Sequence, residues 1–114
     1  MEVTIYHNPR CRKSREALSF LEEKSCKIKV VEYLNDLLSI DELSALLNDL
    51  NIRPIELVRK NESIWKEQFK DRNLSDTAII EAMAQNPKLI ERPIIKSKKG
   101  AVVARPLERV QEVI

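Results

Sequence analysis

The chain has 114 residues, and its 20 lysines and arginines nearly balance its 18 aspartates and glutamates. This length fits one small domain with a core of its own. The balanced charge says little about nucleic acid, but five aromatic residues without an aromatic-basic pattern give poor support for a nucleic-acid partner. No apolar run could span a membrane, and no signal-peptide pattern opens the chain. We therefore expect one domain over residues 1–114, monomeric and cytoplasmic, with no membrane partner.

The first 33 residues predict a strand, a helix and a second strand. Residues 3–6 alternate and are rich in strand-forming side chains. Residues 12–24 place Ser14, Ala17, Leu18 and Leu21 on one helical face. Residues 28–33 again favour a strand. A helix between two strands is typical of a parallel pair.

Helical signals dominate the middle of the chain. The sequence Ser39-Ile40-Asp41-Glu42 is a capping box that precedes a leucine stripe ending at Leu50. Pro54 predicts a short helix through Val58. Ser75 can cap a further helix that ends before Pro87.

The C-terminal part predicts a hairpin and a last helix. Residues 93–95 and 101–104 read as strands, and Gly100, the only glycine, lies in the turn between them. Pro106 begins a helix that we expect to turn Leu107, Val110 and Ile114 inward. The complete order predicts an α/β fold of the thioredoxin/glutaredoxin-like class: a mixed four-stranded sheet with a helical insert between its βαβ and ββα halves.

Cys11 is the strongest candidate for chemistry. It lies between a strand and a helix, four residues after His7, with Arg10, Arg12, Lys13 and Arg15 around it. A helix N-terminus and nearby cations favour the reactive thiolate. The same N-terminus attracts oxyanions. We therefore expect the site to hold a nucleophile and an anion together.

Spacing excludes several cysteine mechanisms. Ser14 stands where a Cys-x-x-Cys oxidoreductase has its second thiol, and Ala17 stands where a tyrosine-phosphatase loop has its arginine. One histidine and two distant cysteines do not make a zinc site, so we expect no metal. Cys11 and Cys26 would lie roughly 20 Å apart along one helix, too far for a disulfide.

Three later arginines are candidates for the same site. Arg92 and Arg105 each precede a proline, which biases the backbone toward extended geometry, and Arg59 follows Leu57-Val58. Side chains at such junctions are often delivered to a common pocket. In a thioredoxin-like domain the proline that opens this strand faces the active site, so Arg92 would project beside Cys11.

The chain resembles the glutaredoxin-coupled arsenate reductases over essentially its whole length. Four segments carry the resemblance: Tyr-His-Asn-Pro-x-Cys-x-x-Ser-Arg at residues 6–15, Leu-Val-Arg-Lys-Asn at residues 57–61, Glu-Arg-Pro-Ile at residues 91–94, and Arg105-Pro106. It departs from familiar members at Arg12 and Lys13, where small or neutral residues are usual; these cations should add positive potential at the pocket mouth.

The resemblance implies a role for each site residue. Cys11 would be the nucleophile, His7 would help to lower its pKa, and Ser14 would hydrogen-bond near the sulfur. The substrate-binding trio would be Arg59, Arg92 and Arg105, with Asn8, Pro9 and Pro93 shaping the site.

The implied reaction needs no tightly bound cofactor. Cys11 would attack arsenate, and glutathione and glutaredoxin would supply electrons as arsenite leaves. Two alternatives stay open. One is a glutathione-dependent reductase of mixed disulfides, against which an oxyanion clamp argues. The other is a transcriptional regulator that binds RNA polymerase, whose redox-sensing members carry the Cys-x-x-Cys that Ser14 denies.

Overall fold

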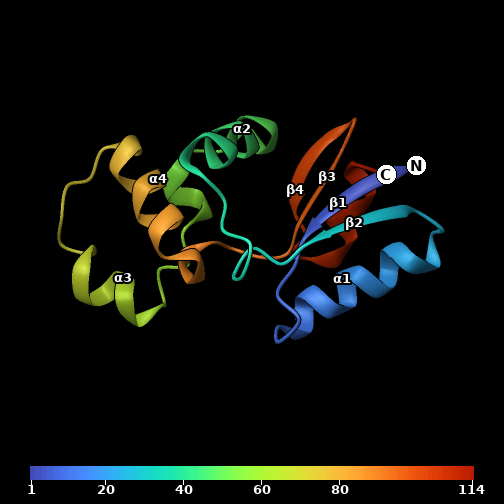
Figure 1. Cartoon of the computed structure of the whole chain (residues 1–114), viewed down its shortest axis with the longest axis horizontal. Helices are drawn as coiled ribbons and strands as arrows, with labels where there is room; N and C mark the ends of the chain where they lie inside the picture. The colour runs from blue at the N-terminus through green and yellow to red at the C-terminus, as the bar shows by residue number, and fades with distance from the viewer. The chain divides into compact units, whose positions relative to one another are not determined.

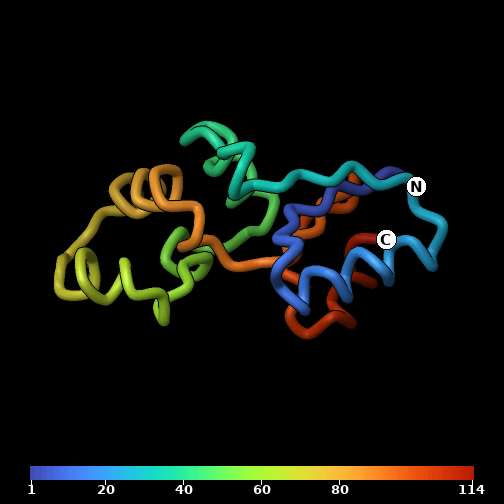
Figure 2. The backbone as a smooth tube through the Cα atoms, turned by 60° about the horizontal axis from the view of Figure 1, so that its bottom comes forward, coloured from blue at the N-terminus to red at the C-terminus, as the bar shows by residue number.

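The computed structural model describes all of residues 1–114 and divides into two compact units. The first consists of residues 1–36 and 92–114, and the second of residues 37–91. Figure 2 traces this path: the two ends of the chain build the first unit, and one continuous excursion builds the second. The helical insert is therefore confirmed. That the whole chain forms one domain stays a prediction.

The first unit is built on a four-stranded mixed sheet (Figure 1). Its strands are β1 (Glu2–Tyr6), β2 (Lys27–Val31), β3 (Ile94–Ser97) and β4 (Gly100–Val103). Their order is β2-β1-β3-β4, with β1 and β2 parallel and β3 antiparallel to both β1 and β4. The predicted parallel pair and the predicted mixed sheet are both confirmed.

Helix α1 (Arg12–Glu23) and the 3₁₀ helix η3 (Leu107–Glu112) pack against one face of this sheet. Successive side chains of a strand point to opposite faces, so each strand contributes alternate residues to the core. The buried cluster contains Val3, Ile5, Ala17, Leu21, Ile95, Val102, Ala104, Val110 and Val113. This core holds the end of β1 and the start of α1 in place, and Cys11 lies between them.

The predicted hairpin of β3 and β4 is confirmed, but Gly100 is the first residue of β4 and not a residue of the turn. Ser97 pairs with Gly100, which leaves Lys98 and Lys99 as the two turn residues. Gly100 has a φ of 132°, a region that glycine enters without steric cost. The position of the only glycine is thus explained by its backbone.

The second unit is helical. It contains α2 (Ile40–Leu50), the 3₁₀ turn η1 (Pro54–Leu57), α3 (Ser63–Gln68), α4 (Asp76–Gln85) and the 3₁₀ turn η2 (Pro87–Leu89). The capping box of α2 is confirmed, since the Ser39 hydroxyl accepts from the Glu42 N–H and the Glu42 carboxylate accepts from the Ser39 N–H. The Ser75 hydroxyl caps α4 by accepting from the N–H of Ala78. No helix of the chain is both long and apolar enough to cross a membrane.

The last helix differs from its prediction. An α-helix would turn Leu107, Val110 and Ile114 inward, but the segment is a 3₁₀ helix in which Val110 and Val113 are buried and Ile114 is only partly covered. A 3₁₀ helix has three residues per turn, so the inward face repeats every third residue and selects Val113. Leu107 and Ile114 still pack against this core, as predicted, but they are only partly buried, and Val113 is the buried residue that the prediction missed.

Candidate functional site

The site forms at one end of the sheet of the first unit. There β1 ends opposite the start of β3, and β4 ends beside it. The N–H of Ala104 donates to the carbonyl of Pro93 at 2.9 Å, which extends the pairing of β3 and β4 by one step. Arg92 lies just before this pairing and Arg105 just after it, and both residues precede cis prolines. The chain that leads to Cys11 leaves β1 at this same end.

Cys11 is the N-cap residue of α1, with extended backbone angles (φ −93°, ψ 121°). Its N–H donates to the carbonyl of Asn8 at 3.0 Å, and its own carbonyl accepts from the N–H of Arg15 at 3.0 Å. The first turn of α1 contains no acidic residue. The sulfur is therefore held at the positive end of a helix, and only part of the residue is covered.

The electrostatics of this position favour the thiolate. Burial raises the pKa of the Cys11 thiol, but the N–H groups of Ser14 and Lys13 and the guanidinium of Arg92 lower it by more. The net pKa lies below the ordinary value of a cysteine. A lowered pKa at a helix N-terminus beside a cation is the usual setting of a nucleophilic cysteine.

Arg92 lies beside Cys11 and lowers its pKa both by charge and by a side-chain hydrogen bond. Its Nε and Nη1 atoms are buried and have no hydrogen-bond acceptor in the protein. Buried donors are normally satisfied, so two unsatisfied donors on one guanidinium call for an explanation. An oxyanion next to the sulfur would supply acceptors in the planar geometry that a guanidinium prefers.

His7 contacts Ser14, and both residues are almost fully buried. Nδ1 of His7 lies 2.6 Å from the Ser14 hydroxyl oxygen, which also accepts from the N–H of Asn8 at 3.0 Å. Burial lowers the pKa of His7, and Arg15 adds to this, while Glu32 acts in the opposite direction. His7 thus ties the loop of residues 7–10 to the first turn of α1. That it helps to lower the thiol pKa stays a prediction.

The loop before Cys11 is braced by its own polar atoms. The Asn8 side-chain oxygen accepts from the N–H of Arg10 at 3.0 Å, and the Pro9 carbonyl accepts from Nη1 of Arg15 at 3.0 Å. Asn8 and Pro9 therefore act here as shaping residues. Arg15, one of the four cations around the thiol, is engaged by the backbone of this loop.

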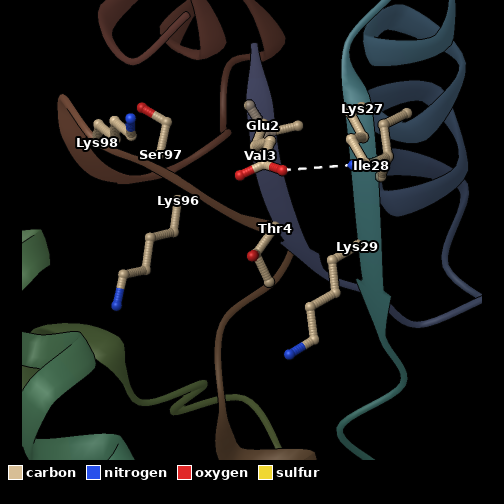
Figure 3. A pocket seen from close by; sticks show the side chains of 9 residues that line it. All are labelled: Glu2, Val3, Thr4, Lys27, Ile28, Lys29, Lys96, Ser97 and Lys98. Carbon is tan, nitrogen blue, oxygen red and sulfur yellow. Dashed lines mark ion pairs between the residues drawn. The ribbon is translucent and has the colours of Figure 1, made fainter.

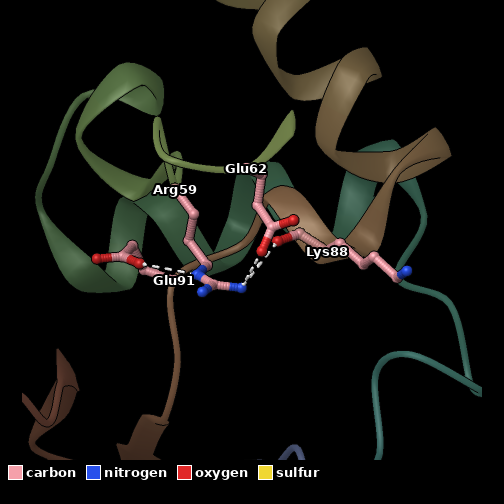
Figure 4. A network of polar contacts seen from close by, with 4 residues as sticks. All are labelled: Arg59, Glu62, Lys88 and Glu91. Atoms are coloured by element: carbon pink, nitrogen blue, oxygen red, sulfur yellow. Dashed lines mark hydrogen bonds and ion pairs between the residues drawn. The ribbon is translucent and has the colours of Figure 1, made fainter. Parts of the chain in front are cut away.

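Arg59 lies in the second unit, where carboxylates surround it (Figure 4). Its Nη1 is 2.6 Å from a Glu62 oxygen, and its Nε is 3.6 Å from a Glu91 oxygen. The carbonyl of Lys88 accepts a longer bond at 3.5 Å. The structure therefore brings Arg92 beside Cys11, leaves Arg105 exposed just after β4, and describes Arg59 only with its acidic neighbours.

Known proteins are similar to this chain over almost its whole length. A sequence model of the ArsC family matches residues 6–113. The chain belongs to the ArsC family. The uncharacterized protein YfgD of Escherichia coli (strain K12) is 44% identical to it, over 99% of this chain and 97% of that protein. The arsenate reductase of Neisseria meningitidis (serogroup A / serotype 4A, strain DSM 15465 / Z2491) is 40% identical, over 99% and 98% of the two chains.

A solved structure supports the assignment of the fold. The structure described as arsenate reductase from Vibrio cholerae has a TM-score of 0.95 to this chain at 42% identity. The match covers 100% of this chain and 98% of the other. The thioredoxin-like architecture expected from the order of elements is thus the architecture of this ArsC-family protein.

Two contacts of the candidate residues escaped the sequence analysis. One is the pair of carboxylates on Arg59; the spacing of three residues between Arg59 and Glu62 is the signal that could have found the first of them. The other is the contact of His7 with Ser14, which lies seven positions later and which no local sequence pattern predicts. Both Cys11 and Cys26 are free thiols.

A second groove lies at the opposite end of the same sheet, with a volume of about 490 Å³ (Figure 3). Lys27, Lys29, Lys96 and Lys98 line it, and Lys27 pairs with Glu2 at 3.5 Å. It contains no thiol, histidine or arginine. Because this groove contains no thiol beside an arginine, the Cys11 end remains the candidate site.

Proposed function

We propose that the protein reduces arsenate to arsenite, with Cys11 as the nucleophile and glutathione and glutaredoxin as the source of electrons. One observation carries the proposal: a thiol of lowered pKa stands beside Arg92, whose buried Nε and Nη1 lack acceptors. Relatives and a solved structure of high similarity bear the name arsenate reductase. Arsenate needs cationic donors beside the sulfur because it is an anion, whereas reduction of a mixed disulfide does not need them.

Arsenate would bind at the sheet end between Cys11 and the arginines. It is a tetrahedral dianion, which suits a guanidinium better than an ammonium group because two parallel N–H donors can meet two oxygens. Arg92 would be the principal ligand, and Arg105, which follows the end of β4, is the second candidate. That Arg59 also binds the oxyanion stays a prediction, and in the structure its guanidinium is held by Glu62 and Glu91.

The first chemical step would join sulfur to arsenic. The Cys11 thiolate attacks As(V) and one As–O bond breaks, and that oxygen takes up protons from the solvent and leaves as water. Negative charge on the remaining oxygens is stabilised by the arginines and by the N–H groups at the start of α1. The hydrogen bonds of the loop over residues 7–10 hold the sulfur in place during this attack.

The second step would transfer the electrons. A glutathione thiolate attacks the Cys11 sulfur and forms a disulfide, while the electron pair of the S–As bond stays on arsenic, which leaves as arsenite. A glutaredoxin thiolate then attacks the glutathione sulfur and releases Cys11 as a thiolate. Ser14 stands where a local second cysteine would be, so this reductant has to come from outside the chain.

The testing experiment is a coupled assay of arsenate, glutathione, glutaredoxin, glutathione reductase and NADPH. We expect NADPH consumption that depends on arsenate, that disappears in Cys11→Ser and that persists in the matched variant Cys26→Ser. A protein that ignores arsenate but reduces a glutathione mixed disulfide through Cys11 would be the alternative thiol reductase. Turnover that survives Cys11→Ser would contradict both functions.

A further inference from the structure

A separate cavity of about 440 Å³ lies entirely within the helical second unit. Its apolar wall consists of Ile55, Trp65, Leu74 and Ile79. Trp65 and Ile79 are 7% and 5% exposed, so they belong to the core of the unit and form a stable floor. The volume lies within the range of small-molecule sites, which typically measure about 300–1,000 Å³.

The rim of this cavity is strongly cationic. Arg53, Lys60, Lys70 and Arg72 line it from three separate segments, and Asp76 is the only carboxylate among the lining residues. All four cations are exposed. Such a convergence of like charges is unfavourable without a counter-charge, because like charges held close together repel.

Most of these cations have no acidic partner within the protein. Arg53 pairs with Glu56 at 3.8 Å, but no salt bridge of the chain involves Lys60, Lys70 or Arg72. Arg59, which belongs to the same unit but not to this rim, has two carboxylates. Within the unit, carboxylates therefore balance the charge of Arg59. Lys60, Lys70 and Arg72 have no such partner and surround the apolar floor of the cavity.

We propose that this cavity binds a small organic dianion with an apolar body, of the class of aryl or alkyl phosphate esters. The apolar part would lie against Trp65 and Leu74, and the anionic head would face Lys70 and Arg72. A dianion is favoured over a monoanion because three rim cations without an ion-pair partner, Lys60, Lys70 and Arg72, face one lining carboxylate, Asp76. None of the residues assigned to arsenate reduction lines this cavity, so the proposal does not depend on that function.

Phenyl phosphate is the probe, since near pH 7.5 its phosphate is largely a dianion (second pKa about 6). The chain has a single tryptophan, so its emission reports on the cavity floor. We expect a saturable change of Trp65 emission on titration, with much weaker binding of inorganic phosphate, which has no apolar body. The double variant Lys70→Gln/Arg72→Gln should weaken binding about tenfold or more, because charge-assisted hydrogen bonds are lost.

Two controls make the result specific. Lys66→Gln/Lys88→Gln removes two exposed cations of the same unit that do not line the cavity, and it should bind phenyl phosphate normally. Arg92→Ala should also bind it normally, and Lys70→Gln/Arg72→Gln should leave arsenate turnover unchanged. Equal weakening in both double variants, or loss of the response in Arg92→Ala, would overturn the proposal. So would the lack of saturable changes both in Trp65 emission and in the amide and indole NMR signals of residues 65–79.

Discussion

Nδ1 of His7 lies 2.6 Å from the hydroxyl oxygen of Ser14, and the same oxygen accepts from the N–H of Asn8 at 3.0 Å. Ser14 lies three positions after Cys11 in the sequence, so the contact fixes the loop before the thiol against the helix that follows it. Ser14 is fully buried and His7 nearly so, which makes both hydrogen bonds costly to lose.

Ser14→Ala should destabilise the fold by about 1–3 kcal/mol, because it leaves two buried polar groups without a partner. The measurement is the free energy of unfolding in urea, followed by circular dichroism. Ser19→Ala is the matched control, since Ser19 lies on the exposed side of the same helix and should change little. Equal free energies of unfolding for the two variants would show that the His7–Ser14 contact does not stabilise the fold.

Stability should fall as the pH is lowered through the titration of His7. Burial lowers the pKa of His7 in the folded protein, whereas the unfolded chain has the ordinary value of about 6.5. Between the two values the unfolded state binds more protons, so the free energy of unfolding rises with pH. The contribution is complete above about pH 6.5 and is lost as the pH falls through the lower, folded pKa.

Urea unfolding of the parent protein and of His7→Gln across this range measures the effect. The difference in slope between them isolates the histidine from the carboxylates, which titrate at lower pH. Parallel curves would mean that His7 titrates alike in the folded and unfolded states.

Arg92→Ala should lower kcat/KM for arsenate by about 10²-fold or more, as the loss of a donor to transition-state charge commonly does. Arg92→Lys should recover part of this, since it keeps the charge but loses the planar fork. Arg109→Ala is the control, because Arg109 is half exposed on η3 and pairs only with Glu112. An Arg92→Ala enzyme as fast as its control would exclude Arg92 from the site.

Glu62→Gln should lower the KM for arsenate if Arg59 is an oxyanion ligand, because it releases charge now held by a carboxylate at 2.6 Å. The pair is partly exposed, so the gain should be at most about fivefold. Glu56→Gln frees Arg53 instead and should have no effect on KM. A rise in KM in Glu62→Gln would show that Glu62 positions Arg59 rather than competing with the substrate.

Much of the fold was predictable from local signals. The capping residues Ser39 and Ser75, the position of Gly100 and the alternation in residues 3–6 all mark boundaries that the structure confirms. Helix α3 was not predicted, because six residues with one buried side chain, Trp65, carry no periodicity. The 3₁₀ character of η3 was also missed, since it depends on packing against the sheet rather than on composition.

The site was predictable in part, and for a topological reason. Arg92 and Arg105 lie at strand junctions, and strand pairing brings those junctions to the end of β1 that leads to Cys11. The partners of Arg59 were out of reach, because Glu91 is distant in sequence and only the fold places it there. The positions of residues at strand junctions can be predicted from the order of the strands, whereas ion pairs between separate turns cannot.

The most direct test of the account is the pKa of Cys11, obtained from the pH dependence of iodoacetamide alkylation in Cys26→Ser, where Cys11 is the only thiol. We predict a pKa below the ordinary thiol value of about 8.5, and a clear rise when Arg92→Ala is added. An ordinary pKa that ignores the loss of Arg92 would contradict the claim that this arginine holds the sulfur ionised.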